Sequence, residues 1–97
     1  MSISVVARKE SGVEIDISSR PIEVTALPAL VSQVPMLRWL APYGNTIFNS
    51  RQAEELIRDI EELDPAERAD GSIVGEILRL ARLLESRPHR YIWFIGD

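Results

Sequence analysis

The sequence predicts an α+β fold: a mostly antiparallel sheet of about four to six strands with two amphipathic helices packed on one face. Strand-like segments fill the first half of the chain, helical periodicity follows from residue 50, and an unbroken apolar run, Tyr91–Ile95, returns to the sheet. The expected order is β-β-(β)-β-β-α-α-β. With 97 residues the chain fits a single domain, 1–97.

The N-terminal segments predict a β-hairpin. Ile3–Ala7 is apolar, Val13–Ser18 alternates apolar and polar residues like a strand with one wet face, and the polar loop between them ends in glycine. Pro21–Thr25 predicts a further short strand. Leu27–Val34 is apolar, but the prolines at 28 and 35 limit any helix there to one or two turns.

The middle of the chain predicts two more strands, Met36–Leu40 and Thr46–Phe48, joined by turn residues at 42–45. Asn49 and Gln52 then have the spacing of a helix capping box. Apolar residues recur at helical spacing over 50–63, which predicts an amphipathic helix. A proline-led single turn is expected at 64–67, and a more deeply buried helix from residue 73 toward Pro88.

The apolar run Tyr91–Ile95 predicts an interior strand covered on both faces, because half-exposed strands alternate apolar and polar residues. The helices are expected over one face, and either a dimer partner or the Leu27–Val34 segment over the other. Trp39 and Trp93 are expected in the core, since both lie in apolar strand-like segments.

Composition excludes several functional classes. The chain has no cysteine, which rules out a disulfide scaffold, and its net charge of −4 argues against nucleic-acid binding. Neither a signal peptide nor an apolar stretch long enough to cross a membrane is visible, so a cytoplasmic protein without a membrane partner is expected. Residues 51–76 hold three basic and nine acidic side chains, so the negative charge is concentrated there.

The residues that carry chemistry are few. His89 is the single histidine, no set of zinc-type ligands exists, and the five glycines form no phosphate-binding loop. Glu14 and Asp16 project from the same side of a strand, which is more typical of a wet face than of a cation site. We therefore expect no catalytic residues, no metal and no cofactor.

The first long helix carries an acidic stripe. Glu55, Asp59 and Glu62 fall at i, i+4 and i+7, and like charges at this spacing destabilise a helix. Such a conflict favours a surface offered to a basic partner. The alternative is a solvated face on which arginines four residues away neutralise the carboxylates. Tyr43 and Asn45, in the predicted turn, are further candidates for contact residues.

Two segments resemble a group of short uncharacterised bacterial proteins. They are Pro42-Tyr43-Gly44-Asn45-Thr46-Ile47-Phe48-Asn49, preceded by Leu37-Arg38, and the ending Tyr91-Ile92-Trp93-Phe94-Ile95-Gly96-Asp97. The resemblance covers the C-terminal two-thirds of the chain. It implies a bacterial protein, and no activity, cofactor or catalytic residue follows from it.

The leading hypothesis is a non-enzymatic protein–protein interaction module, an immunity or antitoxin-like inhibitor of a basic enzyme in a bacterium. The expected contact residues are Tyr43, Asn45, Glu55, Asp59 and Glu62.

Two other functions are consistent with the sequence. One is a small domain or accessory subunit that binds an anionic ligand through Arg38, Trp39 and Arg90. The other is a structural homodimer joined through the uncovered sheet face.

Overall fold

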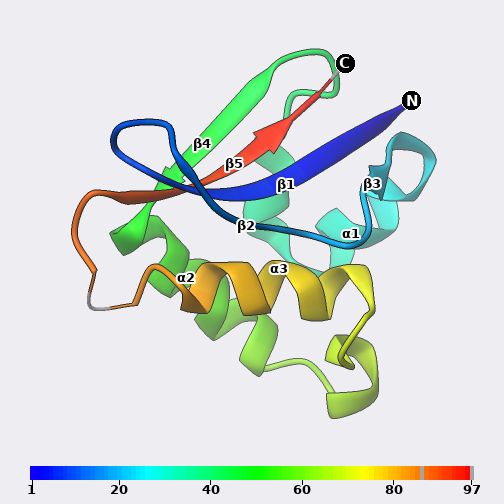
Figure 1. Cartoon of the computed structure of the whole chain (residues 1–97). Coiled ribbons are helices and arrows are strands. Elements are labelled where there is room, and N and C mark those ends of the chain that lie inside the picture. The colour runs from blue at the N-terminus through cyan, green and yellow to red at the C-terminus, as the bar shows by residue number, and fades with distance from the viewer. Residues whose placement is uncertain (86, 97) are drawn as a thin grey trace.

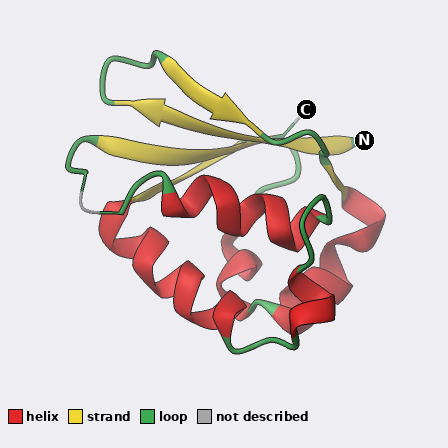
Figure 2. Ribbon diagram, turned by 60° about the horizontal axis from the view of Figure 1, so that its bottom comes forward, coloured by secondary structure: helices red, strands yellow, loops and turns green. Residues whose placement is uncertain are grey.

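A five-stranded antiparallel sheet lies over a layer of helices (Figures 1 and 2). The computed structural model describes residues 1–85 and 87–96. Strand order in the sheet is β2-β1-β5-β4, and a short strand, β3, also pairs with β1. The predicted α+β class, and roughly the predicted order of elements, are confirmed.

The N-terminal hairpin forms as predicted. Strand β1 (Ser2–Lys9) pairs with β2 (Glu14–Ile17), and Gly12 in the connecting loop adopts a positive φ of 89°. That backbone conformation is open to glycine at no steric cost. The short strand β3 (Ile22–Glu23) then pairs with the start of β1.

Strand β5 (Arg90–Ile95) occupies the predicted interior position, between β1 and β4 (Asn45–Asn49). Its side chains alternate in burial. Ile92 and Phe94 face the helices and are almost fully buried, and the Phe94 ring meets that of Phe48 edge to face with centroids 5.6 Å apart. The strand therefore joins two halves of the sheet and anchors the core beneath them.

No described residue of this chain covers the second face of β5, so the predicted cover by Leu27–Val34 is wrong, while cover by a dimer partner stays a prediction. Tyr91, Trp93 and Ile95 lie on the face turned away from the helices and are only partly buried. We call this surface the open face. It is apolar because the strand register aligns four side chains in one row across the sheet, Ile17–Val6–Trp93–Ile47.

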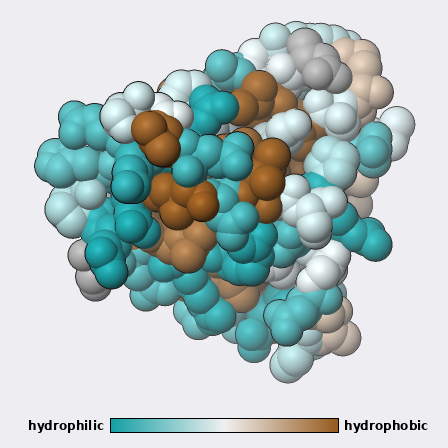
Figure 3. All heavy atoms as spheres, in the orientation of Figure 1, coloured by the Kyte–Doolittle hydropathy of each residue, from teal (hydrophilic) through white to brown (hydrophobic). Residues whose placement is uncertain are grey.

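A basic side chain packs against this apolar row. The Arg8 guanidinium lies 4.8 Å from the centroid of the Trp93 ring, and apolar side chains gather over the strands among hydrophilic ones (Figure 3). Tryptophan and tyrosine tolerate such half-exposed positions. The segment proposed as a cover forms helix α1 (Leu27–Gln33), and its Leu30 belongs to the core on the helix side.

The predicted strand Met36–Leu40 is also wrong. Residues Pro35–Trp39 form a 3₁₀ helix, η2, in which the Leu37 amide donates to Val34 O at 2.9 Å and the Leu40 amide to Leu37 O at 3.1 Å. Proline fixes φ at a helical value at the first position. One turn then buries Leu37 and Leu40 and leaves Trp39 63% exposed, so the expected burial of Trp39 is wrong as well.

The helical layer follows the predicted pattern closely. Helix α2 (Ser50–Glu61) begins with the expected capping box: Asn49 Oδ1 accepts from the Gln52 amide and Gln52 Oε1 from the Asn49 amide, both at 2.9 Å. A 3₁₀ turn, η3 (Pro65–Arg68), leads to α3 (Ile73–Arg82). Helix α2 packs beneath β4 and β5, and α3 beneath β1. Helix α3 ends several residues before Pro88, earlier than predicted.

Within the described residues, no helix is both long enough and apolar enough to span a bilayer.

Candidate functional site

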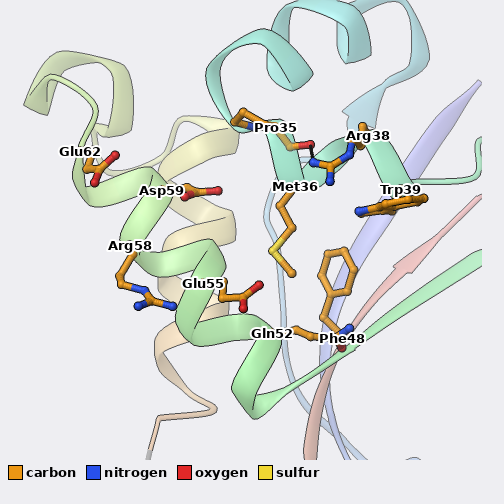
Figure 4. A pocket seen from close by; sticks show the side chains of 10 residues that line it. All are labelled: Pro35, Met36, Arg38, Trp39, Phe48, Gln52, Glu55, Arg58, Asp59 and Glu62. Carbon is orange, nitrogen blue, oxygen red and sulfur yellow. Dashed lines mark hydrogen bonds between the residues drawn. The ribbon is translucent and has the colours of Figure 1, made fainter.

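A groove of about 740 Å³ lies between α2, η2 and β4 (Figure 4). Helix α2 forms one wall, η2 forms the other, and side chains of η2 and β4 meet at its base. The lining residues of the two walls, 35–39 and 52–62, are 13 to 27 residues apart in the sequence, so the fold is what brings them together. The groove is lined by Pro35, Met36, Arg38, Trp39, Phe48, Gln52, Glu55, Arg58, Asp59 and Glu62.

The α2 wall is the acidic stripe predicted from the sequence. Glu55 and Asp59 direct their carboxylates toward the groove, and Glu62 continues the stripe at the end of the helix (Figure 4). Over residues 1–85 and 87–96, none of the three carboxylates takes part in an ion pair or a side-chain hydrogen bond. The predicted i, i+4 ion pairs with arginines of the same helix are therefore absent from the described residues. Arg58 on this wall and Arg38 on the opposite wall also line the groove, so three acidic and two basic side chains leave it a net charge of −1.

The η2 wall presents an aromatic side chain and a cation. Trp39 is 63% exposed, and the Arg38 guanidinium stacks 4.8 Å from its ring centroid. Arg38 is further held by a hydrogen bond from Nη1 to Pro35 O at 3.0 Å. These contacts hold the Arg38 guanidinium against the indole at the rim of the groove, on the wall opposite the acidic stripe.

The base of the groove is apolar. Phe48 and Met36 extend into it from β4 and η2 (Figure 4), and both are buried. An apolar base, an acidic wall and an exposed indole together suit a ligand with a long cationic side chain, whose methylenes contact carbon while its charge meets the carboxylates. Lysine and arginine have this chemistry.

Tyr43 and Asn45 are not among the residues that line the groove: Tyr43 lies on the turn that leads into β4, and Asn45 is the first residue of that strand. The Tyr43 side chain is 73% exposed. The turn is held by bonds from the Gly44 amide to Ala41 O (3.2 Å) and from the Gly96 amide to Gly44 O (2.8 Å). A Cβ at Gly96 would lie 2.3 Å from Pro42 O, so the turn fits closely against the end of β5.

The turn and the η2 wall are joined through one threonine. Thr46 Oγ1 accepts a hydrogen bond from the Ala41 amide at 3.2 Å and donates to Trp39 O at 3.4 Å. The two most exposed aromatic side chains, Trp39 and Tyr43, thus belong to one connected segment at one end of the molecule.

Arg90 is not brought together with Arg38 and Trp39, although the three were predicted as one anion site. Its Nη1 donates to Leu83 O at 2.7 Å, just beyond the C-terminus of α3. Arg90 begins β5 opposite Lys9, whereas Trp39 contacts Thr46, which pairs with Phe94 near the other end of that strand. The Arg90 side chain therefore links the start of β5 to the end of α3 and does not line the groove.

The remaining chemistry-bearing side chains form no second site. His89 Nδ1 lies 3.1 Å from Glu10 Oε2 on an exposed loop, with the histidine backbone at φ 63°. Asp16 is paired with Arg79 and not with Glu14. Where the structure is described, no cluster of three or more potential metal ligands occurs.

One charged cluster was missed from the sequence. Glu76, on the buried side of α3, accepts from the Ser19 amide at 2.7 Å and Oγ at 2.8 Å, and from Arg79 Nε at 2.7 Å. The hydrogen bond from Arg79, aided by those from Ser19, lowers the pKa of Glu76 to about 2. Such a fully bonded carboxylate is a poor proton acceptor. An acid within the apolar stripe of α3 was the signal available in the sequence.

The same cluster also links helix α3 to the edge strand β2. Arg79 Nη1 donates to Asp16 Oδ2 at 2.5 Å and Nη2 to Ile17 O at 3.1 Å, which ties α3 to β2. The hydrogen bond from Arg79 also lowers the pKa of Asp16, and both carboxylates raise that of Arg79. The cluster is a structural clamp between helix and sheet.

In comparisons with known proteins, the sequence matches no family model and is not significantly similar to any curated protein.

Proposed function

We propose that this chain is a non-enzymatic protein-binding module whose acidic groove receives a basic segment of a partner protein. The groove offers carboxylates and an indole, and no nucleophile with an adjacent base lies in it. Exposed aromatic side chains next to complementary charge are the usual anchors of a protein interface.

One observation carries the proposal. Glu55, Asp59 and Glu62 line one wall of the groove, and none of them forms an ion pair within the described residues, although Arg38 and Arg58 also line it; exposed Trp39 stands on the opposite wall. A helix surface selected for stability alone would pair or disperse such charges, because each like-charged i, i+4 pair costs a few tenths of a kcal/mol. A cationic partner removes that cost on binding.

The partner class that fits is a basic enzyme, such as a nuclease toxin. An acidic protein that covers the cationic substrate-binding surface of such an enzyme would act as an immunity or antitoxin-like inhibitor. Charge complementarity of this kind also speeds association, which an inhibitor of a toxin needs. The net charge of −4 is consistent with that role.

Charge reversal in the groove tests the proposal. Tagged protein is purified from its native host, the co-eluting protein is identified by mass spectrometry, and affinity is measured for a triple variant with Glu55, Asp59 and Glu62 replaced by lysine. We expect a loss of about 10- to 100-fold in affinity at low salt, and a weaker dependence of the remaining affinity on ionic strength.

The matched control reverses three exposed acids outside the groove, Glu23, Glu54 and Glu67, with the same change in net charge. The control should lose far less affinity, because long-range attraction is screened while contact charges are not. Equal affinities of the wild type and the groove variant for the identified partner would exclude the acidic groove as the binding site.

A further inference from the structure

The outer edge of β4 has unused hydrogen-bonding groups. The Gly96 amide donates to Gly44 O at 2.8 Å, which fixes the alternation of the β4–β5 ladder. Thr46 and Phe48 therefore turn their backbone groups toward β5, and Ile47 turns its N–H and C=O outward. The Asn49 amide fits the same alternation, because it points away from β5 and donates to Gln52 Oε1.

The outer edge of β2 is closed at Ile17, in a way that the β4 edge is not at Ile47. Ile17 occupies the equivalent outward position, and its N–H donates to Asp16 Oδ1 at 2.8 Å while its carbonyl accepts from Arg79 Nη2 at 3.1 Å. No hydrogen bond in the described part of the chain engages the Ile47 N–H or carbonyl.

Proteins normally protect edge strands with charges, prolines or bulges. The β4 sequence, Asn-Thr-Ile-Phe-Asn, contains no charge and no proline, and its register with β5 is regular. We call the outward backbone of β4 the open edge. It has the form of a template for another strand.

We infer that the open edge is completed by an extended segment of the partner protein in which apolar and basic residues alternate. This inference rests on the proposed function, because the open edge borders the acidic groove (Figure 4). In such a strand addition, backbone hydrogen bonds provide affinity and alternate side chains provide specificity.

The two faces of the sheet determine the alternation. A partner residue paired with Ile47 lies on the open face, beside the apolar row of Ile47 and Trp93. The residues before and after it point to the helix side, where the groove presents Gln52, Glu55 and Trp39. Apolar side chains fit the first position, and lysine or arginine the second.

A second copy of this chain fits the edge less well. Two β4 strands can pair antiparallel about Ile47, but both helical layers then lie on the same side of the joined sheet. Because α2 lies beneath β4, the two acidic stripes would approach each other across the junction. Like charges placed against each other oppose that pairing, so charge favours a basic partner strand.

The probe is a short synthetic peptide that alternates valine with arginine, compared with one that alternates valine with glutamate. Amide hydrogen exchange and chemical shifts of the intact chain are followed by NMR up to about 1 mM peptide, where weak complexes populate. We expect the arginine peptide to slow exchange of the Ile47 amide about tenfold or more. Exchange at Phe48, already bonded to β5, should hardly change.

Two substitutions separate edge pairing from charge attraction. Ile47→Pro removes the outward N–H at a position where an edge strand tolerates proline, and it should abolish peptide binding. Ile47→Thr keeps the N–H and should retain protection of residue 47. If Ile47→Pro fails to fold, peptides methylated on alternate amides replace it: methylation in the phase facing β4 should abolish binding, and methylation in the opposite phase should not.

Each outcome decides between the inferences. Charge-dependent binding without protection of Ile47 overturns strand addition and leaves the basic-partner proposal standing. No shift with either peptide at the highest concentration overturns strand addition to this edge. A concentration-dependent dimer mass with Ile47 already protected in the free chain shows a second copy on the edge, which also overturns it.

Discussion

Single residues in this fold perform tasks that their type alone does not reveal. Glu76 lies at the interior of α3 and is only 6% exposed, yet it is ionised, because Arg79 and both donors of Ser19 satisfy its oxygens. A buried charge is tolerated only when it is paired and hydrogen-bonded in this way. The carboxylate fixes the loop after β2 to the helix layer, and stability should therefore depend on its charge.

Replacement of this carboxylate should destabilise the fold in a pH-dependent manner. The pKa of Glu76 is lowered from 4.5 to about 2, so its charge stabilises the folded state above pH 4.5 and that contribution is lost as pH falls toward 2. We expect Glu76→Gln to reduce the free energy of unfolding by about 2–3 kcal/mol at pH 7. Urea denaturation at a series of pH values measures the difference.

The control for this prediction is Glu67→Gln, which removes an exposed carboxylate from the neighbouring 3₁₀ turn. That variant should follow the wild type at every pH within about 0.5 kcal/mol. A constant gap between wild type and Glu76→Gln from pH 7 down to pH 2 would show that the negative charge of Glu76 does not account for its contribution to stability.

At the scale of elements, local signals predicted the parts whose geometry is set within a few residues. The capping box at Asn49 and Gln52 and the alternation in the hairpin are such signals. The five-residue segment Met36–Leu40 contains too few residues to separate helical from alternating burial. Pro35 decided between them, because its ring sets the first φ of a helical turn and Leu37 and Leu40 then share one buried side.

The same limit explains what was missed at the groove. The acidic stripe was predictable because all three carboxylates belong to one helix, whose period fixes their common face. Their opposite wall was not, since the position of Trp39 depends on the 3₁₀ turn and on how it docks beside β4. Sequence periodicity predicts which residues share one face of a helix or strand, but it does not predict which other element packs against that face.

A glycine in α3 provides a test at this scale. Alanine usually stabilises a helix interior by about 1 kcal/mol relative to glycine. At Gly75 a Cβ would lie 2.1 Å from the backbone oxygen of Ala69, which cannot move without displacing the loop into α3. We expect Gly75→Ala to destabilise the chain by about 1–3 kcal/mol in thermal or urea unfolding. An unchanged or higher midpoint would mean that the loop yields freely.

For the whole molecule, the central strand is the element on which the rest depends. Strand β5 pairs with both β1 and β4 and supplies Ile92 and Phe94 to the core. The apolar run at residues 91–95 therefore correctly predicted an interior strand, although one face of that strand is open. Interior strands hold a sheet together in a way that edge strands do not.

Deletion of residues 91–97 should abolish cooperative unfolding. Without β5 the hairpin and β4 share no partner, and small domains have a free energy of unfolding of only about 5–15 kcal/mol to lose. Circular dichroism during heating measures the transition. A shorter truncation that removes residues 96 and 97 keeps β5 and should still unfold in one step, and a sharp transition in the longer truncation would show that β5 is dispensable.

The two edge strands of the sheet differ in whether their outward backbone groups are hydrogen-bonded, and this difference limits how the molecule can assemble. Ile17 is sealed by Asp16 and Arg79, while Ile47 is left unsealed. A sheet with two such unsealed margins grows into filaments, since every added copy exposes a fresh one. With one margin available, growth stops after a single addition, so the expected stoichiometry is one chain to one partner.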